Sequence, residues 1–182
     1  MASRDLSELK GKKLLIAGDV GTGKTACTAK LLEKILKQAQ EEEITILDFA
    51  PRHGNIGRQL KQYLETIPKN YFAPQKVRAP RLEGKSKAEV IKLATENAKS
   101  MALLLKRYLE NPTKYLIIND VSLYLQAGDC ELLGKCLRKA NTALLNSYYG
   151  SALSEDKGSN ISSIERRNVE KLMGDVDIVM RL

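Results

Sequence analysis

The sequence is poor in cysteine and histidine and contains no tryptophan. Among 182 residues there are three cysteines and one histidine. Cys27, Cys130 and Cys136 are odd in number and lack CxxC spacing, which argues against a disulfide framework and against a zinc site. With His53 as the single histidine, the sequence also argues against a histidine-rich metal site and a Ser-His-Asp triad. This composition fits a reducing compartment, and we expect a cytoplasmic protein.

The sequence also lacks a long apolar run. No run approaches the roughly 20 residues that a membrane helix needs, and residues 1–8 contain no apolar core of a signal peptide. Twelve glycines and five prolines are too few for a collagen-like or low-complexity chain. We therefore expect no export, no membrane span and one globular domain over residues 1–182.

Acidic residues are in the minority. Thirty Lys and Arg against 22 Asp and Glu give a net charge of +8. Such a balance permits an anionic partner, but lysine-rich helix faces produce it equally well. Residues 76–87, here called the basic loop, hold five cations opposed by Glu83 alone. The basic loop indicates a contact with nucleic acid, a protein partner or a bound substrate, and a solvated loop is the alternative.

Short apolar segments alternate with amphipathic ones along the chain. Five of them predict strands, at residues 13–17, 44–49, 115–118, 142–146 and 176–180. Helical spacing predicts a short helix at about 56–65, and a capping box at Ser86 and Glu89 predicts the start of a long one. Residues 68–85 are predicted to be irregular. The alternation predicts an α/β fold of three layers, with a mainly parallel five-stranded sheet between helices.

The first predicted strand runs directly into a glycine-rich turn. Residues 18–25 match GxxxxGK[ST] in full, between a strand and an amphipathic helix. The glycines let successive backbone N–H groups face one phosphate at the helix N-terminus. We expect Lys24 to reach the β- and γ-phosphates and the Thr25 hydroxyl to bind Mg²⁺. The residues expected to contact the nucleotide here are Gly18, Asp19, Val20, Gly21, Thr22, Gly23, Lys24, Thr25 and Ala26.

A carboxylate follows the third predicted strand. Asp120 comes directly after Tyr-Leu-Ile-Ile-Asn, the hydrophobic-strand-then-Asp pattern of a Walker B element. We expect Asp120 and Thr25 to hold the Mg²⁺ of Mg-ATP. A loop aspartate that caps the next segment is the structural alternative.

These motifs resemble the P-loop NTPase superfamily over nearly the whole chain, and most of all its RecA/KaiC-like branch. The resemblance implies a P-loop NTPase fold with sheet order 5-1-4-3-2. It also places Asn146, at the end of the fourth strand, near the γ-phosphate as a sensor. A strand-end turn residue is the alternative for Asn146.

The chain departs from the usual pattern of this branch at the residue after the Walker B aspartate. Many members have a catalytic glutamate there, whereas this chain has Val121. RecA- and KaiC-like members carry the water-activating acid at the end of the second strand, where this chain has Asp48. The resemblance therefore implies that Lys24 and Asp48 are catalytic, with slow hydrolysis. Capping of the turn before Pro51 is an equally compatible role for Asp48.

Two other branches share parts of the pattern. Residues 48–55 resemble the Asp-x-Asp-Pro-x-Gly-Asn segment of MinD/ParA-type ATPases, but Asp19 stands where those proteins carry a second lysine. Corrinoid adenosyltransferases resemble the chain in size and strand count, although nothing in the sequence identifies a corrinoid pocket.

The sequence thus predicts an Mg-dependent ATP-binding protein, a RecA-like ATPase that couples nucleotide binding or hydrolysis to a partner. One alternative is a nucleotide-dependent transferase, a small kinase or a corrinoid adenosyltransferase-like enzyme, with residues 68–87 lining an acceptor site. Another is a nucleotide-gated binding module with little turnover. A homo-oligomer is also compatible, with Arg166 or Arg167 acting as an arginine finger across the interface.

Overall fold

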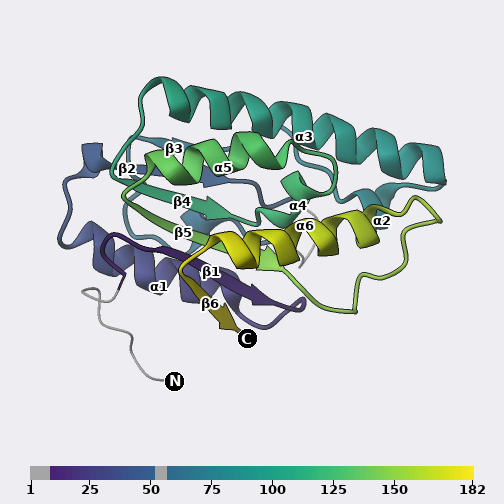
Figure 1. Ribbon diagram of the computed structural model, residues 1–182, viewed down its shortest axis with the longest axis horizontal. Helices are drawn as coiled ribbons and strands as arrows, with labels where there is room; N and C mark the ends of the chain where they lie inside the picture. The colour runs from purple at the N-terminus through teal and green to yellow at the C-terminus, as the bar shows by residue number, and fades with distance from the viewer. Residues whose placement is uncertain (1–8, 52–56) are drawn as a thin grey trace.

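A parallel sheet of six strands forms the centre of the protein (Figure 1). This computed structural model describes residues 9–51 and 57–182. The strands are β1 (Lys13–Gly18), β2 (Ile44–Asp48), β3 (Tyr71–Phe72), β4 (Tyr115–Asn119), β5 (Thr142–Tyr148) and β6 (Ile178–Arg181). All neighbours are parallel, in the order β3-β2-β4-β5-β1-β6.

The predicted strand order is confirmed, and the predicted strand count is wrong by one. When the five expected strands are numbered 1 to 5 along the chain, they correspond to β1, β2, β4, β5 and β6. The observed order β6-β1-β5-β4-β2 is then the predicted order 5-1-4-3-2. The additional strand, β3, lies in the stretch 68–85 that we expected to be irregular. It pairs with β2 through two residues only, Tyr71 and Phe72. A pair of this length leaves no hydrophobic period in a sequence, so the pattern could not reveal it.

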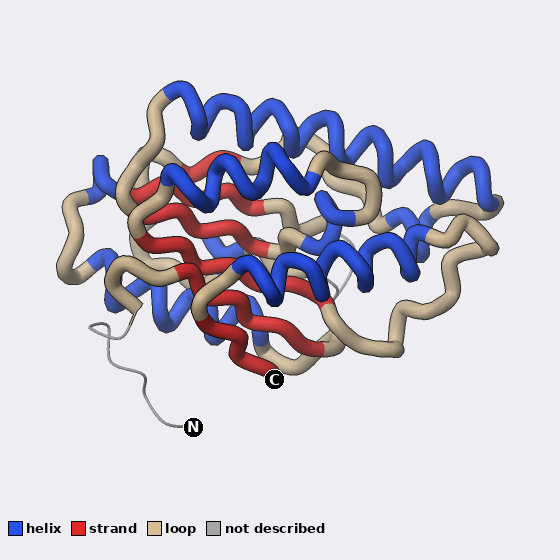
Figure 2. The backbone as a smooth tube through the Cα atoms, viewed as in Figure 1, coloured by secondary structure: helices blue, strands red, loops and turns tan. Residues whose placement is uncertain are grey.

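Helices cover both faces of the sheet (Figure 2). The α-helices are α1 (Lys24–Leu36), α2 (Pro80–Glu83), α3 (Lys87–Glu110), α4 (Ser122–Leu125), α5 (Cys130–Lys139) and α6 (Ile161–Asp175), and the 3₁₀ helices are η2 (Glu41–Glu43) and η3 (Leu60–Gln62). In the part of the chain that the structure describes, no helix combines the length and the apolar character that crossing a bilayer requires. The helix expected at about 56–65 is reduced to η3 within the described residues, and residue 56 lies outside them.

Successive strand residues point to opposite faces, and both faces are buried. On β1, Leu15 packs into a cluster with residues of α3, α4, α5 and α6, whereas Leu14 and Ile16 pack into a second cluster with residues of α1. Figure 1 shows α1 on one side of the sheet and α3, α5 and α6 on the other. Each fully buried Leu or Ile contributes about 1.5–3 kcal/mol of transfer free energy. Burial on both faces is why the strands read as continuous apolar runs.

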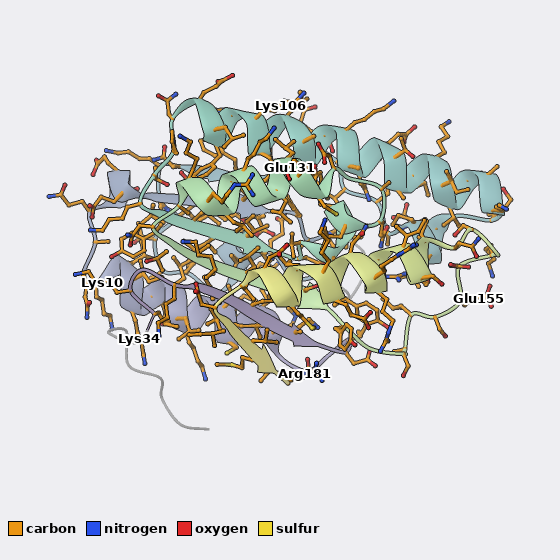
Figure 3. All side chains as sticks on the ribbon, in the orientation of Figure 1. Lys10, Lys34, Lys106, Glu131, Glu155 and Arg181 are labelled. Carbon is orange, nitrogen blue, oxygen red and sulfur yellow. The ribbon has the colours of Figure 1, made fainter. Side chains whose placement is uncertain are left out.

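Charged side chains extend over the outer surfaces of the helices (Figure 3). Lys34 on α1 and Lys106 on α3, both labelled there, belong to helices that pack on opposite faces of the sheet. Positive side chains are therefore present on both helical layers.

Candidate functional site

The turn between β1 and α1 presents backbone N–H groups at a helix N-terminus. Gly21 and Gly23 have φ angles of 77° and 86°, in the left-handed region that favours glycine. A Cβ atom at either position would meet nothing within 4 Å, so conformation rather than space requires glycine there. Gly23 is the N-cap of α1 and offers no side chain to the first turn. The N–H groups of that turn are consequently oriented for an anion.

Lys24 folds back over this turn. Its Nζ donates to the backbone oxygen of Asp19 at 2.5 Å, and the Thr22 hydroxyl donates to the same oxygen at 3.0 Å. Burial lowers the pKa of Lys24, while the carboxylates of Asp120 and Asp19 oppose that effect. The ammonium group thus lies between the loop and a carboxylate, where it can neutralise a phosphate.

The Asp19 side chain fixes the loop to a neighbouring segment. Its carboxylate accepts N–H bonds from Val20 at 2.6 Å, Ser151 at 3.0 Å and Ala152 at 3.3 Å. The bonds from Ser151 and Val20 lower the pKa of Asp19. A Cβ atom at Gly150 would overlap the Asp19 carboxyl group, so a larger residue there would require the Asp19 side chain to move. Asp19 therefore holds the phosphate loop against the segment after β5.

Asp120 lies at the end of β4 in an unusual backbone conformation. Its φ is 59°, and its N–H donates to Oδ1 of Asn146 at 2.8 Å. The Ser122 hydroxyl donates to Oδ1 of Asp120 at 2.7 Å. Burial raises the pKa of Asp120, an effect that the Ser122 hydrogen bond and the Lys24 ammonium oppose. The carboxylate is thus held at the carboxyl edge of the sheet, facing the positive charge of Lys24.

One cavity of about 370 Å³ brings the main expected residues together. Of the residues expected from the sequence, those that line it are Val20, Gly21, Gly23, Lys24, Thr25, Ala26, Asp120 and Asn146. We call this cavity the phosphate pocket. Gly18, Asp19 and Thr22 belong to the same turn but do not line the pocket.

The oxygen donors of the pocket suit a hard divalent cation. Thr25 supplies a hydroxyl and Asp120 a carboxylate, which are ligands that Mg²⁺ accepts beside phosphate oxygens and water. Across residues 9–51 and 57–182, no three His, Cys, Asp or Glu side chains gather as a metal-binding group. With a nucleotide bound, Thr25 and Asp120 are the residues of the pocket that could hold Mg²⁺.

Asp48 lies beneath the pocket surface rather than on it. Its side chain is completely buried and is not among the residues that line the phosphate pocket. One oxygen accepts from Asn119 Nδ2 at 2.7 Å and from the Ala50 N–H at 3.2 Å. The other accepts from the Leu60 N–H at 2.7 Å and from the Tyr71 hydroxyl. These four bonds favour a structural role, and the role of general base stays a prediction.

Asn119 and Asn146 extend this buried polar chain across the strand ends. Asn146 Nδ2 donates to Asn119 Oδ1 at 2.7 Å and to the Thr28 hydroxyl at 2.8 Å. Both amide protons of Asn146 are therefore used within the protein, and its oxygen holds the Asp120 N–H. Asn146 lines the phosphate pocket, and its hydrogen bond positions the backbone of Asp120. The sensor role expected for it stays a prediction.

Sequence reasoning missed several residues of the pocket. Arg58 and Tyr63 line it from the segment after β2, Tyr148 lines it from the end of β5, and Leu153 lines it from the segment after β5. Arg58 is exposed and adds a second cation beside Lys24. No motif surrounds Arg58, so its position became evident only from the fold. For Tyr148, the single sequence signal was an aromatic pair beside a predicted loop.

The basic loop presents fewer free cations than its composition predicted. Arg78 forms an ion pair with Glu83. Arg81 is buried and forms an ion pair with Glu165 on α6. The cations left exposed in the loop are Lys76, Lys85 and Lys87.

Comparison with known proteins agrees with this geometry. The family model described as "Type III restriction enzyme, res subunit" matches residues 2–127, more than two thirds of the chain. The chain belongs to this family. Together with the phosphate loop and the parallel sheet, the match places it in the P-loop NTPase superfamily and supports an ATP-binding protein of that class.

Solved structures show only distant likeness. The cytoplasmic domain of the type VII secretion ATPase EccC from Thermomonospora curvata is 11% identical, with a TM-score of 0.45, over 89% of this chain and 18% of that one. The Pif1 helicase from Candida albicans is 15% identical, with a TM-score of 0.37, over 97% of this chain and 37% of that one. This chain spans well under half the length of either. None of the curated proteins matches it in sequence.

Proposed function

We propose that the protein is an Mg-dependent, RecA-like ATPase that folds as a single nucleotide-binding domain and couples ATP binding or hydrolysis to a partner. The observation that carries this proposal is the convergence of Lys24, Thr25 and Asp120 on one pocket beside an N–H-rich helix start. The strand order, with β5 between the phosphate-loop strand and the Asp120 strand, supports the RecA-like branch.

In this proposal each group of the pocket has one task. The backbone of residues 18–25 cradles the phosphates, and Lys24 neutralises the β- and γ-phosphates. Thr25 and Asp120 hold Mg²⁺, which when bound spreads the developing charge of the phosphoryl group. Arg58 supplies a further positive charge to the pocket from the segment after β2. Asn146 keeps Asp120 in its left-handed conformation.

The decisive experiment compares Lys24→Ala with Lys30→Ala. Lys30 is exposed on the same helix and does not line the phosphate pocket, so it controls for the loss of one charge. Lys24→Ala is expected to weaken Mg-ATP binding at least ~100-fold, because charge-assisted bonds to phosphate are lost while the core is untouched. Isothermal titration calorimetry measures both affinities. Equal affinities in folded Lys24→Ala and wild type would overturn the proposal.

Nucleic acid is the partner that we propose. The matching family is described as a subunit of a restriction enzyme, and the net charge of +8 favours a polyanion. The three exposed lysines of the basic loop are the proposed contact. Stimulation of ATP turnover by nucleic acid tests the coupling.

A nucleotide-dependent transferase is the second candidate, because a further cavity adjoins the phosphate pocket. This cavity of about 300 Å³, here called the outer cavity, shares Tyr148 and Leu153 with the pocket. Arg81, from the segment expected to line an acceptor site, forms part of its wall. Turnover of ATP that requires an added acceptor would favour this candidate over the ATPase.

A further inference from the structure

A buried amide joins the segment after β2 to the end of β4. Asn119, the last residue of β4, is completely buried. Its Nδ2 donates to the backbone oxygen of Arg58 at 3.1 Å and to Oδ1 of Asp48 at 2.7 Å. Arg58 lines the phosphate pocket, whereas Asn119 does not. The backbone of a pocket residue is therefore held by a side chain that is not itself part of the pocket wall.

The oxygen of the Asn119 amide is connected to the phosphate-loop side of the pocket. It accepts from Nδ2 of Asn146 at 2.7 Å, and the same Nδ2 also donates to the Thr28 hydroxyl at 2.8 Å. The Thr28 hydroxyl in turn donates to the backbone oxygen of Lys24 at 2.9 Å. A hydrogen-bonded chain consequently runs from the first turn of α1 to the segment that carries Arg58.

The two amides of this chain each have one orientation that satisfies their neighbours. Asp48 and Arg58 present only oxygen atoms to Asn119, so its NH₂ group must face them. Its oxygen then faces the Nδ2 of Asn146, whose own oxygen accepts the Asp120 N–H at 2.8 Å. Reversal of either amide would leave buried donors and acceptors unpaired, which is costly in free energy. The backbones of Arg58 and Asp120 are therefore held relative to each other by two amides of fixed orientation.

The charge of Arg58 remains available to a ligand. None of the ion pairs within residues 9–51 and 57–182 involves Arg58, and its side chain is exposed at the pocket. A long side chain of this kind loses conformational entropy when it is ordered on a ligand. A backbone that is already held in place lowers the cost of placing the guanidinium on a phosphate.

We propose that Asn119 is a positioning residue, which holds the Arg58 backbone so that the guanidinium reaches a phosphate of the bound nucleotide. The inference rests on the proposed function. Asn119 does not touch the nucleotide, so its effect on nucleotide affinity passes through Arg58. When the Asn119 side chain is removed, Asn146 keeps its bonds to Thr28 and Asp120. Removal of the Arg58 side chain should therefore abolish the effect of Asn119 on affinity.

The test is a double-mutant cycle on the full chain. Isothermal titration calorimetry measures the affinity for Mg-AMP-PNP, a non-hydrolysable analogue of Mg-ATP. We expect Arg58→Ala and Asn119→Ala each to weaken binding by at least ~10-fold, because both lose a charge-assisted bond to phosphate. The double variant should bind no more than about threefold more weakly than Arg58→Ala alone, whereas independent effects would multiply to ~100-fold.

Asn97 on α3 provides a matched control for the loss of a buried amide. It is 1% exposed, and its side chain holds the backbone of Arg78 by accepting the N–H at 3.0 Å and donating to the oxygen at 2.9 Å. Neither residue lines the phosphate pocket. Asn97→Ala should lower the unfolding free energy, as Asn119→Ala does, but should bind Mg-AMP-PNP within about twofold of wild type. A purely structural role of Asn119 would give the same result as Asn97.

The opposite results identify what has failed. If wild type binds neither Mg-AMP-PNP nor Mg-ADP, the proposed function itself fails. If wild type binds but either single variant binds equally tightly, or if the two effects multiply, the positioning role of Asn119 is overturned and the nucleotide site stands. Should Asn119→Ala not fold, Asn119→Thr replaces it in the same cycle. A threonine hydroxyl has one hydrogen, for which the charged Asp48 is a stronger acceptor than the Arg58 carbonyl.

Discussion

The carboxylate of Asp48 is completely buried at the end of β2. Four hydrogen bonds converge on its two oxygens, from Asn119, Ala50, Leu60 and Tyr71. In an asparagine at this position, the NH₂ group would face one pair of these donors and could accept no hydrogen bond from them. For Asp48→Asn we expect a loss of about 2–4 kcal/mol of unfolding free energy, with turnover per folded molecule changed by less than about fivefold.

Chemical denaturation and steady-state hydrolysis on one preparation check this prediction. A general base would give the reverse pattern: unchanged stability, with turnover reduced by roughly 10²–10⁴. The control is Asp175→Asn, at the end of α6, which removes an exposed carboxylate from outside the pocket.

Glu165 makes stability depend on pH. Burial raises the pKa of its carboxyl group from 4.5 to about 7, while Arg81 opposes the shift. Between these values the folded protein keeps a proton that the unfolded chain has released. This contribution to stability is full below about pH 4.5 and is lost as the pH rises through about 7, by up to about 3 kcal/mol.

The comparison that isolates this effect is wild type against Glu165→Gln. The amide still accepts a hydrogen bond from Arg81 and does not titrate. We expect the unfolding free energy to fall less between about pH 5 and about pH 8 in Glu165→Gln than in wild type. Denaturation in urea at both pH values measures it, and identical pH dependence in the two proteins would mean that Glu165 does not titrate in this range.

At the scale of elements, the start of α3 is a point where local sequence controls a long helix. The Ser86 side chain accepts the Glu89 N–H at 3.3 Å, as the capping box predicted. The other half of the box differs, because the Glu89 carboxylate accepts from the Lys85 N–H at 2.7 Å instead of from Ser86. Ser86→Ala should therefore lower the unfolding free energy by about 1 kcal/mol.

A matched control lies within the same helix. Ser100 is an interior residue whose hydroxyl donates to the Asn97 carbonyl, and alanine is the better helix former there. Ser100→Ala should leave the melting temperature unchanged or slightly higher. If Ser86→Ala and Ser100→Ala lost equal amounts of unfolding free energy, the N-cap hydrogen bond of Ser86 would not contribute to stability.

Elements with their own sequence signal could be predicted, and elements created by tertiary contact could not. The phosphate turn, β1 and α1 follow from glycine spacing and hydrophobic period, which are local properties. By contrast, α2 and α4 have four residues each, and β3 has two. Such short elements form because their neighbours provide hydrogen bonds and apolar contact, so no period precedes them in the sequence.

The same division holds within the site. Lys24, Thr25 and Asp120 were predicted because motif spacing places them at the carboxyl edge of the sheet. Arg58 and Tyr63 reach the same pocket from a segment without a motif. Their positions depend on how the segment after β2 packs, which a single sequence does not encode as a pattern.

At the scale of the whole molecule, the distribution of charge determines how a polyanion would bind. We expect nucleic-acid affinity to fall steeply with salt concentration, because each contacted phosphate releases counterions. Replacing Lys76, Lys85 and Lys87 together by alanine should reduce the slope of log affinity against log salt by about 2–3. Fluorescence anisotropy with labelled single-stranded DNA measures the slope.

The control for this triple change has the same net charge. Lys30, Lys37 and Lys135 are exposed and lie outside the basic loop, so their joint replacement by alanine removes three charges elsewhere. If both triple variants reduce the slope equally, nucleic acid responds to the overall charge, and the basic loop has no special part.

The row of amides across the strand ends also offers a means of observing the site. The side-chain N–H groups of Asn119 and Asn146 are buried and hydrogen-bonded, so their hydrogens should exchange with solvent slowly and give persistent nuclear magnetic resonance signals. Because the Asn146 oxygen holds the backbone of Asp120, a ligand that moves Asp120 will shift these signals. The protein thereby carries an internal spectroscopic reporter of pocket occupancy that requires no label on the nucleotide.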